Sequence, residues 1–279
     1  MNDISFTLDL EDHQPKNFKE SNYSSISKEL LSSLKDRGIS ATVFVLGKLA
    51  YSDPELIKHI VDNGHEVAYH SYQHTPLIYQ NPSEFISETE KFKEFIFKQC
   101  GIEVKGYRAP VFSLTSKTTW VVDCLMDLGF SYSSSVLPAG SPLYGFPSAP
   151  KKPFRWNNGI IELPAPIHKF GPISIPFLGG IYFRYLPLFL ICRFLRSMNE
   201  NHVPWIYCHP HDFDYKQPYF KIPGNSHIVS LLLWINRKGT NRKLFKLIDN
   251  DEFKIEKRSF IQQIEEGKFN ALPSYSFSN

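Results

Sequence analysis

The sequence is poor in the features that mark two large classes of protein. Its 279 residues include only four cysteines. They stand singly among apolar neighbours, so we expect reduced core residues and neither a disulfide framework nor a zinc site built on CxxC pairs. The formal net charge is only +3, and the densest basic stretch, Asn236–Lys246, is predicted to be a loop and one helix face. Nucleic-acid-binding proteins show a more concentrated basic surface, so no nucleic-acid partner is expected.

Long apolar runs are also missing. The most apolar region, Phe170–Leu195, is interrupted by prolines, by glycines, and by Arg184 and Arg193. This is not the pattern of a membrane-spanning helix. Acidic residues appear at Asp3 and Asp9 before any long apolar stretch, which is not the pattern of a signal peptide. The sequence therefore predicts a cytoplasmic protein, with peripheral contact at a membrane surface left open.

The chain does have the composition for a large core, since 42% of its residues are hydrophobic and 15% aromatic. Strand-like and helix-like segments alternate. The strands are predicted within "DISFTLDL", "ATVFVLG", "HEVAYH", "VKGYRAP" and "GFSYSSSV", and the helices over Ser24–Asp36, Asp53–Asn63, Asn81–Gln99 and Thr115–Leu128. Repeated βα units predict an α/β fold with a mainly parallel sheet or barrel. No internal repeat or domain boundary is evident, so residues 1–279 are expected to form a single domain.

Polar clusters follow several of the predicted strands. In parallel α/β folds, function gathers at the carboxyl ends of the strands. The clusters are Asp9–Asp12, His70–His74, Arg108–Pro110, Ser133–Ser135 and His209–Asp214. We therefore expect these segments to meet in one site.

The stretch "AYHSYQHT" places His70 and His74 four residues apart. On one turn of helix such residues share a face, so the two rings would converge on one point. Convergent neutral imidazoles suit a transition metal, zinc above all. The alternative is two unrelated histidines, and a third ligand is needed to decide between them.

Several motifs occur in an order that resembles the polysaccharide deacetylase family, the NodB-like enzymes of carbohydrate esterase family 4. They are "TLDLEDHQ", "GHEVAYHSYQH", "GYRAPVFSLT", "LGFSYSSSVLP", "IELPAP", "GGIYFRYLP" and "YCHPHDFD". More narrowly, they are similar to the cytoplasmic-type branch tied to surface-polysaccharide biosynthesis. The resemblance covers roughly Ser5 to Asp214, followed by a C-terminal extension over 215–279. It implies a distorted (β/α) barrel of about seven strands, fewer than the usual eight.

The resemblance assigns His70 and His74 as metal ligands. The acidic cluster is then expected to supply the general base, Asp9, and a third ligand. Asp12 is slightly favoured as that ligand and Glu11 is the alternative: strand alternation puts Asp9 and Glu11 on one side, whereas a turn after the strand could swing Asp12 inward. Three protein ligands leave a position for water, as in catalytic zinc sites. Zinc is preferred, with cobalt, manganese or iron also accepted by such a ligand set.

The resemblance also implies roles for residues farther along the chain. Arg108 matches the arginine that orients the base, and His209 matches the histidine that protonates the leaving amine. The backbone N–H of Val111 matches a group that helps to hold the oxyanion. Tyr182 and Arg184 are expected to line the sugar cleft, with ordinary core packing as the alternative.

The chain departs from the family pattern at several positions. Ser133 stands where an aspartate is frequent, His13 where an aromatic residue is frequent, and His211 and Asp212 where tryptophan and glutamate are frequent. These departures put the substrate preference in doubt and leave the general acid in place. Glu162 is expected either to orient that acid or to form a salt bridge at a strand end.

The function implied is a metal-dependent N-deacetylase acting on an N-acetylated sugar in a polysaccharide or a lipid-linked precursor. Two alternatives remain open. One is a metal-independent amidase similar to the allantoinase branch of the superfamily, and the other is an inactive glycan-binding homologue. The expected partner is an N-acetylated glycan, and the sequence leaves the oligomeric state undetermined.

Overall fold

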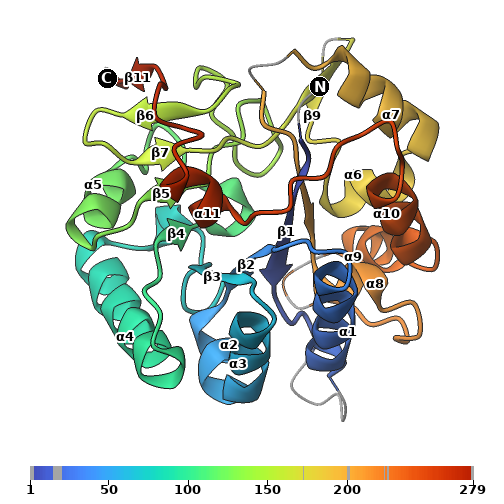
Figure 1. The fold of residues 1–279 in the computed structure, drawn as a ribbon, viewed down its shortest axis with the longest axis horizontal. Coiled ribbons are helices and arrows are strands. Elements are labelled where there is room, and N and C mark those ends of the chain that lie inside the picture. The colour runs from blue at the N-terminus through green and yellow to red at the C-terminus, as the bar shows by residue number, and fades with distance from the viewer. Residues whose placement is uncertain are drawn as a thin grey trace.

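A nine-stranded sheet forms the centre of the molecule in the computed structural model, which describes residues 3–14, 21–171, 173–199, 202–222, 224 and 226–277 (Figure 1). Its strand order is β10-β1-β2-β3-β4-β5-β7-β6-β11. The seven strands from β10 to β7 are parallel neighbours. β6 runs antiparallel to β7, and β11 runs parallel to β6. A mainly parallel sheet flanked by helices confirms the predicted α/β class and is consistent with a distorted barrel.

Most of the strands are short. They are β1 (Ser5–Leu10), β2 (Thr42–Val45), β3 (Glu66–Tyr69), β4 (Gly106–Tyr107), β5 (Tyr132–Ser133), β6 (Phe154–Trp156), β7 (Ile161–Glu162), β10 (Trp205–Cys208) and β11 (Ser274–Tyr275), with β8 (His168–Phe170) and β9 (Ile173–Ile175) forming a separate hairpin.

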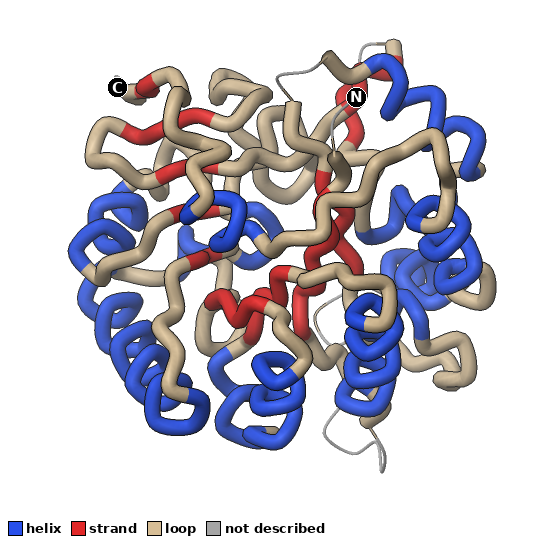
Figure 2. The backbone as a smooth tube through the Cα atoms, viewed as in Figure 1, coloured by secondary structure: helices blue, strands red, loops and turns tan. Residues whose placement is uncertain are grey.

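The helices lie around the sheet, as the tube drawing also shows (Figure 2). They are α1 (Tyr23–Lys35), α2 (Gly47–Ser52), α3 (Pro54–Asp62), α4 (Pro82–Cys100), α5 (Trp120–Asp127), α6 (Gly180–Tyr185), α7 (Leu188–Ser197), α8 (Pro210–Phe213), α9 (His227–Trp234), α10 (Thr240–Ile248) and α11 (Phe260–Glu265), with short 3₁₀ turns at Leu77–Tyr79 and Pro110–Phe112. Within the described residues, no helix is both long enough and apolar enough to cross a membrane.

The predicted helices α1, α3 and α4 agree with the structure to within about one residue at each end, the usual uncertainty of helix boundaries. α5 begins at Trp120 rather than at Thr115. The preceding residues form a turn in which the Thr118 hydroxyl accepts from the Thr115 backbone N–H at 2.8 Å and donates to the Ser113 carbonyl at 2.9 Å. This side chain competes with the helix for backbone groups and so delays its start.

The sheet brings the ends of β1, β2 and β10 together. All six residues of β1 are buried. Leu8 pairs in register with Cys208 of β10, and Leu10 pairs with Val45 of β2. Because these three strands are parallel, the residues that follow them emerge at one edge of the sheet. The predicted clusters around Asp9 and His209 therefore meet there.

One close backbone approach places α6 beside this edge. Gly179 forms an isolated bridge with Tyr207 of β10. A Cβ atom at Gly179 would lie only 2.0 Å from the Tyr207 ring, so no other residue fits. α6 starts at the next residue and is thereby held against the end of β10.

The C-terminal extension is bonded into the sheet. The Thr42 hydroxyl accepts from the Phe260 backbone N–H at 2.9 Å, and the buried Glu66 carboxylate accepts from the Ile261 N–H at 3.1 Å. β11 adds the last strand, beside β6. The four cysteines are free, as predicted.

Candidate active site

A buried carboxylate, Glu11, follows β1 and lies close to two histidines that follow β3. Its Oε1 atom is 3.0 Å from Nε2 of His70 and 2.9 Å from Nε2 of His74. The potential ligand atoms of these three residues all lie within 4.8 Å of one another. The His pair therefore has a third potential ligand, and we call these three residues the ligand cluster.

The loop after β3 brings the two histidines together without a helical turn. Ser71 and His74 both adopt left-handed backbone conformations, with φ of 68° and 65°. The backbone N–H of His74 donates to the Ser71 hydroxyl at 3.0 Å. The predicted convergence of the rings is present, with centroids 5.3 Å apart, but the helical geometry proposed for it is wrong.

The ligand cluster has the chemistry to hold a divalent metal. Nδ1 of His70 lies 2.8 Å from the Arg108 carbonyl, which can only accept, so Nδ1 carries the proton and Nε2 presents a lone pair to Glu11. Two acceptors 3.0 Å apart need a cation or a shared proton between them. Burial lowers the pKa of His74, against the opposing effect of Glu11, and a lowered pKa favours the neutral imidazole that metal binding requires.

The Glu11 carboxylate is held in its charged form. Burial acts to raise its pKa, but His74, His209 and His13 together bring the pKa well below the ordinary glutamate value. Its second oxygen, Oε2, is 2.8 Å from Nε2 of His13. A carboxylate beside two imidazoles is a ligand set found in catalytic zinc sites.

Asp12, the carboxylate favoured as ligand by sequence reasoning, lies outside the three groups of potential metal ligands found among the described residues. Its Oδ1 accepts from the Gln14 backbone N–H at 3.0 Å, and its Oδ2 accepts from the Ser21 hydroxyl at 2.8 Å. The alternation of β1 continues one residue beyond the strand and keeps Glu11 on the side of Asp9. The geometry therefore favours Glu11, and the preference for Asp12 is corrected.

Asp9 is paired with Arg108 in the interior. Arg108 Nη1 donates to Asp9 Oδ1 at 2.5 Å and to the Thr7 hydroxyl at 2.9 Å. The guanidinium lies 3.9 Å from the Phe44 ring centroid and 4.3 Å from that of Trp205, so its position is fixed by packing as well as by charge. This arrangement matches the predicted pairing of base and arginine, and it leaves Oδ2 of Asp9 facing the site.

His209, at the end of β10, lies on the other side of Glu11. Its Nε2 is 3.8 Å from Oε1 of Glu11 and 4.0 Å from Oδ2 of Asp9. Its Nδ1 is 3.0 Å from Oδ2 of Asp212. Burial lowers the His209 pKa, but Glu11 and Asp212 outweigh it and raise the pKa to about 9. The ring is therefore a cationic proton donor whose Nε2–H faces the site.

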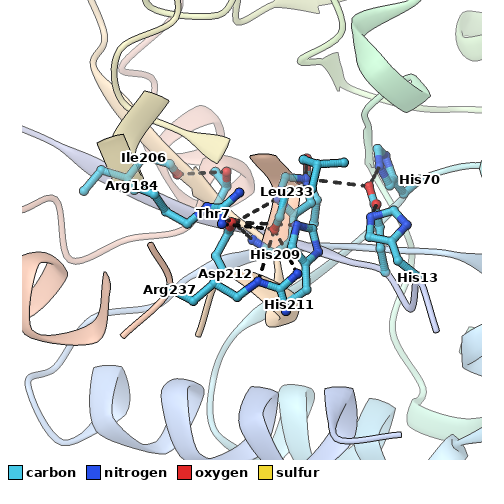
Figure 3. A network of polar contacts seen from close by, with 12 residues as sticks. Thr7, His13, His70, Arg184, Ile206, His209, His211, Asp212, Leu233 and Arg237 are labelled. Atoms are coloured by element: carbon cyan, nitrogen blue, oxygen red, sulfur yellow. Dashed lines mark hydrogen bonds and ion pairs between the residues drawn. The ribbon is translucent and has the colours of Figure 1, made fainter. Parts of the chain in front are cut away.

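Asp212 is the residue that sequence reasoning missed. Its Oδ2 also accepts the His209 backbone N–H at 2.8 Å, which forms a capping box at the start of α8. The signal was present in "HPHD", since an N-cap residue followed three positions later by an acidic residue is the pattern of that motif. Figure 3 shows His209 and Asp212 between the rings of His70 and His13 on one side and Arg184 on the other.

Arg184 does not line a sugar cleft, contrary to expectation. It is 1% exposed, and its Nε lies 2.9 Å from Oδ1 of Asp212. Its Nη1 donates to the carbonyls of Leu233 and Ile235 at 3.0 and 2.8 Å. The close approach of α6 to β10 turns this arginine inward. Tyr182 on the same helix is 37% exposed, so its role in substrate binding stays a prediction.

Glu162 does not contact His209, so its proposed orienting role is wrong. Its Oε1 accepts from the backbone N–H groups of Ser135 and Val136 at 2.7 and 2.9 Å, and its Oε2 accepts from Trp156 at 3.2 Å. It therefore fixes the loop after β5.

Of the residues that depart from the family pattern, Ser133 lies in the interior, and His13 and His211 lie beside His209. Ser133 is buried and bonded to the Ser135 hydroxyl at 2.8 Å. His211 stacks on His209, with centroids 4.8 Å apart, and packs edge-on against His13 at 4.7 Å. Two of the departing residues, His13 and His211, thus form part of the wall of the site.

Val111 has a strained backbone. Its φ is 48° and that of Phe112 is 53°. A β-branched residue in the left-handed region costs free energy and is concentrated at functional positions. The backbone of Ala109, two residues earlier, is fixed by its N–H bond to Ser135 at 2.8 Å. The oxyanion role of the Val111 N–H stays a prediction.

Residues 12–132 match the family model described as Polysaccharide deacetylase. This part of the chain is similar to the polysaccharide deacetylase family. A second model, described as a Domain of unknown function (DUF3473), matches residues 134–260 of the same chain. The deacetylase match holds the histidine pair and Arg108, whereas His209 lies in the second match.

Part of the chain is also similar to curated proteins that are named as deacetylases, and it spans only a small share of their length. A peptidoglycan-N-acetylglucosamine deacetylase of Listeria monocytogenes is 32% identical over 93 residues, which cover 33% of this chain and only 20% of that protein.

Solved structures share the fold. A structure described as a putative polysaccharide deacetylase from Mycobacterium smegmatis has a TM-score of 0.61 at 16% identity and covers 100% of this chain and 95% of that one. A carbohydrate esterase family 4 pseudoenzyme from Bacillus anthracis has a TM-score of 0.51 at 14% identity, and the match covers 94% of this chain and 65% of that one.

Proposed function

We propose that the protein is a metal-dependent N-deacetylase of N-acetylated sugars. One observation carries the proposal: a buried carboxylate, Asp9, and an imidazole, His209, lie beside Glu11 of the ligand cluster. Nε2 of His209 is 4.0 Å from Oδ2 of Asp9 and 3.8 Å from Oε1 of Glu11, and the potential ligand atoms of these three residues lie within 4.8 Å of one another. A base, an acid and a metal site within reach of one bond are what amide hydrolysis requires.

A divalent metal bound by Glu11, His70 and His74 would polarise the acetyl carbonyl and lower the pKa of a water molecule. Oδ2 of Asp9 accepts the proton of the attacking water, while Arg108 holds the other oxygen. The water oxygen forms a bond to the acetyl carbon. Nε2 of His209 then gives its proton to the amide nitrogen as the carbon–nitrogen bond breaks. The products are acetate and a free amino sugar.

The proposed substrate class rests on the name of a similar protein and not on the geometry of the site. The curated relative carries a name that specifies deacetylation of N-acetylglucosamine in peptidoglycan. For this chain we propose an N-acetylated sugar in a polysaccharide or lipid-linked precursor, with Tyr182 as an exposed stacking surface. Membership of the cytoplasmic-type branch, and a cytoplasmic location, are part of this proposal.

The test is acetate release from a panel of N-acetylhexosamine oligomers and lipid-linked sugars, with and without chelator. We expect release that chelator abolishes and that zinc, or else cobalt, manganese or iron, restores. His70→Ala should be inactive, and His202→Ala, a histidine outside the cluster, serves as the matched control. Release that survives chelator would indicate the metal-independent amidase. Glycan binding without release would indicate an inactive binding protein.

A further inference from the structure

The helix α9 is oriented with its polar side inward. Of its eight residues only Ser230 is buried. Four apolar residues are exposed instead: Ile228 at 72%, Leu231 at 46%, Val229 at 41% and Leu232 at 39%. At 3.6 residues per turn these four lie on one face and Ser230 lies on the opposite one. Surface helices normally bury the apolar face, so this orientation is the reverse of the usual one.

Polar bonds hold α9 in this orientation. The Ser230 hydroxyl accepts from the Ile222 backbone N–H at 3.1 Å and donates to the Ser226 carbonyl at 2.9 Å. Arg184 donates to the Leu233 carbonyl at 3.0 Å, and Arg237 donates to the same carbonyl at 2.8 Å. The helix is thus fixed through its backbone, and its apolar side chains remain free for contact with something else.

Two exposed tyrosines extend the apolar face. The Tyr185 hydroxyl donates to the Leu232 carbonyl at 3.1 Å, and the Tyr219 hydroxyl lies 3.2 Å from Nδ1 of His227. Both tyrosines are 38% exposed. We call the six side chains the apolar patch: Tyr185, Tyr219, Ile228, Val229, Leu231 and Leu232. Aliphatic side chains bordered by tyrosines are typical of surfaces that insert at a membrane interface.

The chain around the apolar patch carries positive charge only. From Tyr215 to Ile248 the sequence has no aspartate or glutamate, whereas it has seven basic residues: Lys216, Lys221, Arg237, Lys238, Arg242, Lys243 and Lys246. Lys221 and Lys238, which flank α9 in the sequence, are exposed. α9 and α10 lie on the same side of the molecule in Figure 1. Basic residues beside an apolar surface complement anionic lipid headgroups.

We propose that the apolar patch is a peripheral docking surface for a lipid bilayer with anionic headgroups. The aliphatic side chains of α9 enter the headgroup region, the tyrosines lie at its level, and the lysines contact the headgroups. This surface adjoins the site, since Arg184 bonds both to α9 and to Asp212 behind His209. The inference concerns binding alone and does not depend on the proposed deacetylase activity.

The test is co-sedimentation of the full-length protein with phosphatidylcholine vesicles, with and without phosphatidylglycerol. We expect binding to the anionic vesicles, weakened by salt because the headgroup contacts are screened. The double variant Ile228→Ser/Leu232→Ser should bind at least about tenfold more weakly. As the control, Leu143→Ser/Tyr79→Ser removes two apolar side chains outside the apolar patch that are 72% and 74% exposed, at least as exposed as the two residues changed in the test variant, and it should bind as the wild type does.

Charge is tested separately with Lys221→Glu/Lys238→Glu, which should reduce binding to anionic vesicles. Circular dichroism and metal content verify that each variant is folded. Failure of the wild type to bind anionic vesicles would overturn the proposal, as would an undiminished affinity in Ile228→Ser/Leu232→Ser. The apolar patch could instead bind a second copy of the chain, and sedimentation velocity measures whether the protein dimerises. Dimerisation that this double variant abolishes would assign the patch to a second copy of the chain and would also overturn it.

Discussion

A single oxygen of Asp212, Oδ2, contacts both the ring and the backbone of His209, at 3.0 Å from Nδ1 and 2.8 Å from the backbone nitrogen. The carboxylate thereby fixes the ring relative to the end of β10. Its other oxygen lies 2.9 Å from Nε of Arg184, so Asp212 is itself held in place. The consequence is that Nε2 of His209 is directed toward Asp9 and Glu11 without any contribution from substrate.

Asp212→Asn should move the alkaline limit of activity to lower pH. Burial lowers the pKa of His209, and Glu11 and Asp212 raise it to about 9. A general acid must be protonated, so activity falls as pH rises through that pKa. Without the Asp212 charge the fall should begin at lower pH, and turnover near neutrality should drop by about tenfold to a hundredfold. A pH profile of kcat measures both effects.

The matched control for this variant is Asp214→Asn. Asp214 is a buried acid at the other end of α8, bonded to Gln217 and Asn22. The Asp214→Asn variant should lose activity at the same alkaline pH as the wild type. An Asp212→Asn profile that coincides with the wild type would show that this carboxylate does not act through His209.

Glu11→Gln should abolish stoichiometric metal binding, whereas Asp12→Asn should retain it. Oε1 of Glu11 lies 3.0 Å from Nε2 of His70 and 2.9 Å from Nε2 of His74, whereas Asp12 accepts hydrogen bonds from Gln14 and Ser21. Elemental analysis of the dialysed proteins measures the difference. The reverse result would restore Asp12 as the carboxylate ligand.

His209→Ala should impair amide hydrolysis more than ester hydrolysis. An amide nitrogen needs a proton to leave, whereas an activated phenolate does not. Turnover on an acetamide substrate should fall by about 10² to 10⁴, with metal content unchanged. Assays with an N-acetyl sugar and with nitrophenyl acetate make the comparison. Equal losses on both would identify His209 as a structural residue, with His211 the next candidate for the acid.

Protonation of the buried His65 ring should lower the free energy of unfolding in mild acid. Its Nδ1 accepts from the Ala41 N–H and its Nε2 donates to the Leu31 carbonyl, each at 3.0 Å. Burial, opposed by the Leu31 bond, lowers the pKa from 6.5 to about 4. Below pH 6.5 the unfolded chain therefore binds more protons than the folded one, and stability falls as pH drops toward 4, by about 3 kcal/mol in total.

Urea unfolding of the metal-free protein at pH 7 and pH 5 measures this effect. His65→Gln should show a smaller loss between the two values, and His227→Gln, an exposed histidine, should behave as the wild type does. The same loss in all three proteins would place the acid sensitivity elsewhere.

The alternation of "TLDLED" predicted that Asp9 and Glu11 share a side, and the structure places both at the site. Local periodicity was sufficient because β1 is a regular strand whose neighbours on both sides are parallel. Asp12 follows the strand, where alternation no longer governs direction. Its hydrogen bonds to the following loop decided its position, and sequence spacing does not reveal them.

The sequence alone did not predict the positions of residues that are fixed by contacts between distant segments. Arg184 belongs to an aromatic stretch that reads equally as cleft or core. Its burial follows from Gly179 packing on the Tyr207 ring, a contact across 28 positions of sequence. The loop holding His74 depends on a left-handed backbone conformation at Ser71. Serine rarely adopts this conformation, so the sequence does not predict it.

The pairing of β1 with β10 joins the N-terminal part of the chain to the segment that the second family model matches, residues 134–260. Glu11, His70 and His74 lie before residue 133, and His209, the proposed proton donor, lies after it. A fragment ending at residue 133 would retain the ligand cluster but lose the acid. It would also leave the edge of β1 that pairs with β10 without a partner, and an unpaired strand edge is the kind of surface through which chains aggregate. Exchanging either segment between relatives would therefore have to preserve the register of this one strand pair, Ser5 opposite Trp205 through Leu8 opposite Cys208.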